Sequence, residues 1–149
     1  MVKARAYYQK LLETSSDGIH VLSETGELLE ANAAFYKLLG YPPENPPKLN
    51  VLDWDAKSPA EELKVQVKRL IVETELFETV HRRRDGRLID VEIHTRRIEL
   101  NGQSCLYNSS RDITGRKRAE SALRESQEKF SKIFQASPVA VLVTTRVAP

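Results

Sequence analysis

Two short turns on either side of a long run of alternating residues constrain the fold of this chain most strongly. The dipeptides Asp85-Gly86 and Asn101-Gly102 stand between segments that are rich in β-branched residues. Such dipeptides favour two-residue hairpin turns, because their residues tolerate positive φ. The sequence therefore predicts three consecutive antiparallel strands. We place these strands at residues 76–83, 87–100 and 103–113.

The middle strand of this group has the clearest face pattern. Its apolar residues alternate with charged ones, and a period of two is typical of a strand with one buried and one solvated face. The last strand continues the pattern, although polar residues stand at some of its inward positions. The residues predicted to point inward are Ile89, Val91, Ile93 and Thr95, followed by Leu106, Asn108 and Ser110.

The first half of the chain predicts two further strands, at residues 19–23 and 27–31. Asn32 is a good N-cap for the helix that follows, and Gly40 stands where a left-handed C-cap belongs. A proline-rich loop and a helix over residues 59–74 then lead to the three strands. This order predicts an α+β fold, a five-stranded antiparallel sheet covered by helices on one face. An N-terminal helix and a C-terminal coiled-coil linker helix flank it.

Composition excludes several classes of partner. The formal net charge is +2, so the basic run at residues 82–84 is interpreted as a solvated hairpin tip and not as a nucleic-acid site. The single cysteine, Cys105, allows no internal disulfide, and we expect a cytoplasmic location. No apolar run approaches the length of roughly 18 residues that a membrane helix needs. We therefore expect no membrane span within this segment.

Catalytic signatures are missing from the sequence. It has no paired nucleophile and base, no cluster with metal-ligand spacing and no phosphate-binding glycine loop. We predict that this segment is not an enzyme and holds no metal. Cys105, which follows a turn at the start of a strand, is interpreted as an inert structural thiol.

Three separated segments together resemble a PAS domain with its C-terminal PAC motif. The first is SSDGIHVLSETGELLEANAAFYKLLGY, at residues 15–41, and the second is the hairpin HRRRDGRLIDVEI, at residues 81–93. The third is the tetrapeptide Arg-Asp-Ile-Thr at residues 111–114, which leads into a charged helix. Each segment is weak by itself, but their order and spacing along the chain match the family.

The resemblance implies a sensory module. PAS domains bind a small ligand or cofactor between sheet and helices, or pair with one another, and pass a change of shape to a helix. In bacteria that helix usually leads to a histidine kinase, a diguanylate cyclase or another sensory domain. We therefore expect this chain to be an excerpt of a longer protein, with an output domain in the same chain and a homodimer as its state.

The resemblance also argues against two cofactors. Haem-binding relatives commonly hold iron with a histidine on the long helix before the hairpins, and residues 59–74 contain none. Cysteinyl-flavin relatives need an Asn-Cys-Arg-Phe context, which is missing here. The histidines His20, His81 and His94 are interpreted as surface residues, with His20 pointing away from the pocket. The cofactor stays unknown.

A pocket between sheet and helices is the expected ligand site. Asn108 and Ser110 are unusual on a core-facing strand row, and an unpartnered buried amide costs about 1–3 kcal/mol. A ligand, a water molecule or a neighbouring side chain can satisfy them. Trp54 either covers the pocket or fills the core. The candidate pocket residues are Val21, Ser23, Asn32, Phe35, Trp54, Val91, Ile93, Thr95, Asn108 and Ser110.

The exit of the last strand is the expected signal relay. In the family the aspartate of the Asp-Ile-Thr motif ties this strand to the linker helix, which assigns the relay to Asp112, Ile113 and Thr114. In the helix, apolar or small residues recur with the 4-3-4-3 spacing of a heptad seam. The seam residues are Ala119, Leu123, Ser126, Phe130 and Ile133.

A repeated pattern suggests a second domain. Residues 8–23 and 130–145 both read as a short amphipathic helix, a small polar break and a β-branched strand, which predicts the start of a second PAS repeat. The expected divisions are a flanking helix at 1–14, a PAS/PAC domain at 15–114, a linker helix at 115–136 and a truncated second PAS domain at 137–149. A dimerisation module that binds no ligand is the alternative to a sensor.

Overall fold

The computed structural model describes residues 2–70 and 75–136. The chain divides into two compact units, the first ending at Ile113 and the second beginning at Thr114. The segment 137–149, which carries the predicted strand of a second PAS repeat, lies outside the described residues, so that repeat stays a prediction.

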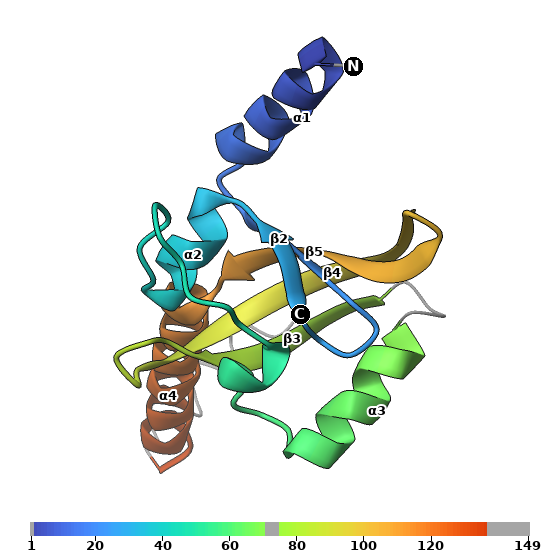
Figure 1. Ribbon diagram of the computed structural model, residues 1–149. Helices are drawn as coiled ribbons and strands as arrows, with labels where there is room; N and C mark the ends of the chain where they lie inside the picture. The colour runs from blue at the N-terminus through green and yellow to red at the C-terminus, as the bar shows by residue number, and fades with distance from the viewer. Residues whose placement is uncertain (1, 71–74, 137–149) are drawn as a thin grey trace, which may run out of the picture. The chain divides into compact units, whose positions relative to one another are not determined.

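The core of the first unit is one antiparallel sheet with the strand order β2-β1-β5-β4-β3 (Figure 1). The predicted α+β fold with five strands is therefore confirmed. β1 pairs with β5 in the middle of the sheet, which brings the first strand of this unit beside the last one. The strands are β1 Gly18–Leu22, β2 Leu28–Ala31, β3 Glu75–Arg82, β4 Leu88–Leu100 and β5 Gln103–Asp112.

Both predicted hairpin turns are present. Gly86 has a φ of 88°, and Asn101 and Gly102 have φ values of 51° and 77°. Asn101-Gly102 has positive φ at both central residues, the geometry of a type I′ turn, which suits the right-handed twist of the strands that it joins. At Asp85-Gly86 only the glycine has a positive φ, and the Gly86 N–H donates to the Arg83 carbonyl at 2.9 Å, so this loop is longer than the predicted two-residue turn. These turns set the long register in which β4 pairs with β3 and with β5.

Helices cover one face of the sheet (Figure 1). Phe35 and Leu39 from α2 meet Val67 and Leu70 from α3 in a cluster that also includes Trp54. The helices of this unit are α1 Val2–Thr14, α2 Ala33–Leu39, the 3₁₀ helix η1 Val51–Asp53 and α3 Ala60–Leu70. The helix predicted over residues 59–74 is confirmed as far as Leu70, and residues 71–74 lie outside the description.

Asn32 is the hydrogen-bonding centre of the N-terminal half. It caps α2 as predicted, and its buried side chain makes four hydrogen bonds of 2.8 to 3.1 Å. The amide oxygen accepts two backbone N–H groups and the amide nitrogen donates to two backbone carbonyls, so its capacity is fully used. The partners are Leu12, Asp17, Ile19 and Phe35. One side chain thus joins the end of α1 to β1 and α2.

The second unit contributes one long helix, α4, at Thr114–Ala136. None of its residues is buried within this chain. Arg116 and Glu120 form an i,i+4 ion pair of 3.6 Å, and the rings of Phe130 and Phe134 stack at 5.4 Å. Helix α4 is therefore well formed along its own axis while its apolar residues remain exposed.

Candidate functional site

A small cavity of about 40 Å³ lies between the inner face of the sheet and the segment from η1 to α3. That volume holds a water molecule or two but no larger guest in this conformation. Its wall is mostly apolar, made of aliphatic and aromatic side chains with several polar ones between them, as expected of a small-molecule site. The polar and aromatic residues that line it are His20, Trp54, Asp55, Gln66, Phe77, His81 and Asn108.

His20 lies in this site, and its predicted outward orientation is wrong. It is only 2% exposed and pairs directly with Asn108 across β1 and β5. Directly paired residues share a face, so His20 and Asn108 both point inward. Val21 pairs with Tyr107 and lies on the opposite face, which corrects its assignment to the pocket. All five β1 residues are buried, so burial on both faces hid the orientation from the sequence pattern.

Ser23 is also outside the pocket. It follows the end of β1 and belongs to the turn before β2. Its hydroxyl oxygen accepts the backbone N–H groups of Thr25 and Glu27, at 3.3 and 3.1 Å. Serine commonly stabilises turns in this way, so its role here is to shape the turn.

His81 is a second inward histidine that the sequence interpretation placed on the surface. It is 1% exposed and lines the cavity from β3, where it pairs with Ile89 of β4. His94, in contrast, is exposed as predicted. Thr79 and His81 lie on the same inward face of β3, where they pair with Val91 and Ile89. Because both residues are polar, the sequence pattern did not mark this face as buried.

Aromatic rings surround both buried histidines. The His20 ring stacks on Phe35 with centroids 4.1 Å apart, and the indole of Trp54 meets it edge-on at 5.8 Å. Trp54 also approaches the His81 ring at 6.4 Å. Burial lowers the pKa of His81 from 6.5 to about 4. Burial, with a smaller contribution from His81, lowers the pKa of His20 well below its usual value. Both imidazoles are therefore neutral at neutral pH.

Several polar atoms of the inner face lack partners. Within the described part of the chain, four buried side-chain atoms on the inner face of the sheet have no hydrogen-bond partner: Nδ1 of His20, Nδ1 of His81, Oγ1 of Thr95 and Oγ of Ser110. Asn108 differs, because its Nδ2 donates to the carbonyls of His20 and Leu106. Buried polar groups without protein partners are rare, and each calls for water or a ligand.

The remaining predicted pocket residues lie in different parts of the domain. Trp54, Ile93 and Asn108 line the cavity. Phe35, Val91 and Thr95 are fully buried around it without lining it. Asn32 is structural, as described above, and Ser110 lines a separate open groove near Arg83 and Arg111. The cavity is therefore lined by both buried histidines but by only three of the ten predicted pocket residues.

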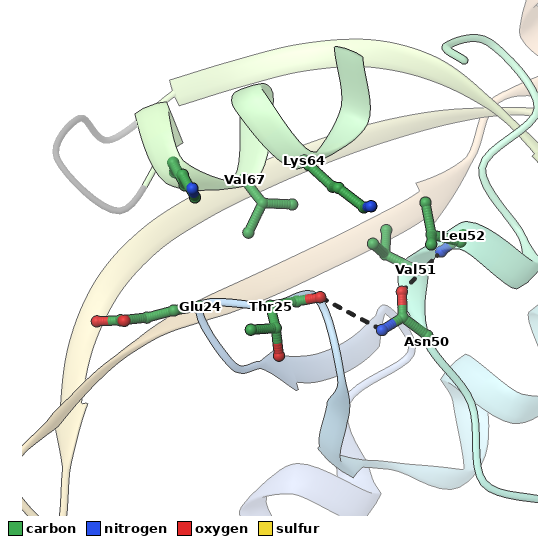
Figure 2. Close-up of a pocket in the computed structure, with 8 residues that line it drawn as sticks. Glu24, Thr25, Asn50, Val51, Leu52, Lys64 and Val67 are labelled. Carbon is green, nitrogen blue, oxygen red and sulfur yellow. Dashed lines mark hydrogen bonds between the residues drawn. The ribbon is translucent and has the colours of Figure 1, made fainter. Parts of the chain in front are cut away.

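A surface groove of about 220 Å³ adjoins the cavity (Figure 2). Val51 and Val67 line both spaces, so these two side chains form the wall between them. In Figure 2, Lys64 points across the groove toward η1, whereas the Glu24 carboxylate extends away from it. Sequence reasoning missed this groove because its sides come from the β1–β2 turn, η1 and α3. The residues that line it are Glu24, Thr25, Asn50, Val51, Leu52, Lys64, Val67 and Lys68.

The end of β5 is firmly tied to its neighbours. The Ile113 N–H donates to the Asp90 carbonyl at 2.8 Å, and the Ile113 side chain is buried. One residue before the motif, the Arg111 guanidinium donates to both carboxylate oxygens of Asp17, at 3.2 and 3.3 Å. Asp112 pairs opposite Val91 at the last position of the strand. The predicted relay therefore begins on a strand end that is held from both sides.

Among the described residues, no group of three or more histidine, cysteine, aspartate or glutamate side chains is arranged to hold a metal ion. Likewise, no helix in the described ranges is long and apolar enough to cross a membrane.

Comparison with known proteins identifies the fold. The PAS fold family matches residues 6–108. The chain belongs to the PAS family. The PAS domain of an HTR-like protein from Haloarcula marismortui is 31% identical, with a TM-score of 0.68 over 75% of this chain and 93% of that chain. No curated protein matches the sequence.

Two further PAS structures resemble the chain in fold. A sensory box histidine kinase/response regulator from Burkholderia thailandensis is 22% identical, with a TM-score of 0.62 over 84% of this chain and 98% of that chain. A PAS domain from a two-component sensor histidine kinase is 18% identical, with a TM-score of 0.62 over 74% and 97% of the two chains. The chain thus shares the PAS fold with a domain of a sensor histidine kinase.

Proposed function

We propose that this PAS domain is the input module of a signal-transduction protein. A small ligand, cofactor or redox cue acts at the buried polar side chains of the inner face. The change passes along β5 through Asp112, Ile113 and Thr114 into α4. A paired α4 then relays it to an output domain such as a histidine kinase or a diguanylate cyclase.

One observation carries the proposal. His20, Asn108 and Thr95 form a continuous polar row across β1, β5 and β4. The middle strand of that row is β5, which ends one residue before Ile113. A ligand that bonds to this row therefore acts on the strand that leads directly to the linker. Coupling requires two states that differ by only a few kcal/mol, because a ligand shifts an equilibrium by no more than its differential affinity.

The alternative function is a dimerisation module that binds no ligand. The small volume of the cavity, about 40 Å³, favours it. The exposed residues of α4 favour it as well, because Leu123, Phe130 and Ile133 are 59%, 65% and 71% exposed. In this alternative α4 still pairs with a second copy, but no ligand acts on the domain.

An absorption spectrum and a native mass spectrum of the purified chain separate the two functions. The sensor proposal predicts a bound mass or a visible band that decreases in an Asn108→Leu variant. The dimerisation module predicts a dimer of bare chains in both proteins. In the full-length protein, the relay proposal also predicts that Asp112→Ala abolishes regulation of the output domain, and unchanged regulation would exclude it.

A further inference from the structure

The shared wall between the groove and the cavity suggests a single divided site. Val51 belongs to η1 and Val67 to α3, so the wall is made by two different elements. The two spaces, of about 220 and 40 Å³, are each smaller than a typical small-molecule site. We propose that they are the two halves of one site, which opens when the valines separate, and that its ligand is an aromatic carboxylic acid with a ring hydroxyl. This inference rests on the proposed sensory function.

The outer half suits an anionic group. Lys64 and Lys68 line the groove one helical turn apart, and Glu24, the only acidic side chain among the described residues of its lining, extends away from it (Figure 2). Lys64 is 3.5 Å from Glu61, an exposed pair that contributes little and is easily exchanged. A ligand carboxylate bound between the ammonium groups of Lys64 and Lys68 would therefore experience a net positive charge.

The inner half suits an uncharged group that both donates and accepts hydrogen bonds. His20, His81 and Asn108 all line the cavity. Each neutral imidazole has one donor and one acceptor nitrogen, and a phenolic hydroxyl complements both functions. A negatively charged group is disfavoured there, because no lysine or arginine lines the cavity to compensate its desolvation and the Asp55 carboxylate carries the same sign. The edge of Trp54 and the apolar wall favour a flat ring between the two ends of the ligand.

One side of the dividing wall is fixed more firmly than the other. The Val51 N–H donates to the Gly26 carbonyl at 2.8 Å, and Asn50 Nδ2 donates to the Thr25 carbonyl at 3.3 Å. These bonds attach η1 to the β1–β2 turn. Helix α3, in contrast, contacts the core mainly through the apolar side chains of Leu63, Val67 and Leu70. We infer that α3 is the wall that moves when the site opens.

The test uses isothermal titration calorimetry on the whole chain with three matched probes. 4-Hydroxyphenylacetate carries both groups, phenylacetate lacks the hydroxyl, and 2-(4-hydroxyphenyl)ethanol lacks the charge. The first probe is expected to bind at least about tenfold more tightly than either of the others, which corresponds to one good polar interaction at each end. Equal affinities for the three probes, or no binding of the first, would overturn the proposal.

Variants assign each end of the probe to its residues. Replacing both Lys64 and Lys68 by Gln is expected to abolish the preference over the alcohol while keeping the preference over phenylacetate. Asn108→Leu is expected to abolish the preference over phenylacetate while keeping the preference over the alcohol. Val67→Ala should tighten binding of all three probes, whereas Val65→Ala, at an exposed position on the same helix, should not. An unchanged preference in either polar variant contradicts the assignment.

The two proposals fail separately. If the purified chain carries a different bound molecule and 4-hydroxyphenylacetate does not bind, the ligand class is wrong and the sensory function stands. If no molecule co-purifies and no probe binds, both are wrong and the dimerisation module remains.

Discussion

The body of this PAS domain and its helix α4 place polar and apolar groups in opposite ways. The body buries polar side chains on the inner face of its sheet, among them His20, His81 and Asn108, behind an apolar layer of helices. Helix α4 keeps its charged residues in solvent and leaves large apolar side chains such as Phe130 exposed as well. Buried polar groups and exposed large apolar side chains both cost free energy, so each of these features calls for an explanation.

We propose that the two regions have separate tasks. The body completes its packing within one chain and retains hydrogen-bonding capacity inside, which suits recognition of a small molecule. The apolar seam of α4 follows a heptad, which suits a second copy of the same helix. Changes confined to one region at a time test this division.

Acid pH should have the largest effect, because it charges the interior of the body. The unfolded chain takes up protons on His20 and His81 near their usual pKa of 6.5, whereas burial keeps the folded chain neutral to lower pH. Stability is therefore complete above the unfolded pKa and falls as the pH decreases toward the folded one. For His81, with a folded pKa of about 4, the loss is about 3 kcal/mol.

Urea unfolding at neutral and at mildly acid pH measures this loss. His81→Gln should flatten the acid slope, while His94→Gln, which alters an exposed histidine on β4, should leave it as in the wild type. The same acid slope in His81→Gln and the wild type would mean that His81 is not buried in its neutral form.

Asn32→Ala should have the second largest effect, because it removes a polar group of the body whose hydrogen bonds are all satisfied. Loss of the α2 cap and of three further bonds should lower the free energy of unfolding by about 2–3 kcal/mol. Asn50→Ala is the matched control, since Asn50 also caps a helix but at a half-buried site, and about 1 kcal/mol is expected there. Equal losses in the two variants would refute the role of Asn32 as the link to α1.

Phe130→Glu tests the role of the exposed apolar residues of helix α4. A charge in the α4 seam should weaken self-association at least about tenfold without changing the unfolding of the body. Sedimentation equilibrium gives the association constant and urea unfolding gives the stability. Gln127→Glu adds the same charge to α4 outside the seam and should leave association intact. If both variants associate like the wild type, the seam is not the dimer interface.

Thr95→Val should have the smallest effect and the opposite sign. The Thr95 hydroxyl oxygen is buried without a partner in the described chain, so an isosteric methyl should raise stability by about 1 kcal/mol. Val91→Thr, the reverse exchange on the same row of β4, should destabilise. A loss of stability in Thr95→Val would show that this hydroxyl already has a partner in the free protein, such as ordered water.

Local chemistry made much of the fold predictable from the sequence. The Asn-Gly and Asp-Gly turns, the Asn32 cap and the strict alternation of β4 each act over a few residues, so sequence neighbours suffice to recognise them. The alternation was informative in β4 because one of its faces is wet, which separates the two sets of side chains cleanly.

The site was less predictable because β1 and β3 do not alternate between a buried apolar face and a solvated polar face. β1 is buried on both faces, so the sequence could not tell that His20 rather than Val21 points inward. β3 inverts the expected pattern, with Leu76 exposed and Thr79 and His81 buried. The groove combines a turn, a 3₁₀ helix and α3, and no local pattern brings these segments together.

The most direct test of the account follows a change in the body into α4. Hydrogen–deuterium exchange, read by mass spectrometry, compares the wild type with Asn108→Leu, which alters the inner face of β5, and with Tyr107→Phe, which alters its other face. The account predicts that Asn108→Leu changes exchange in α4 severalfold, that Tyr107→Phe does not, and that adding Asp112→Ala to Asn108→Leu removes the change. Identical α4 exchange in Asn108→Leu and the wild type would contradict the claim that the polar interior and the linker are coupled.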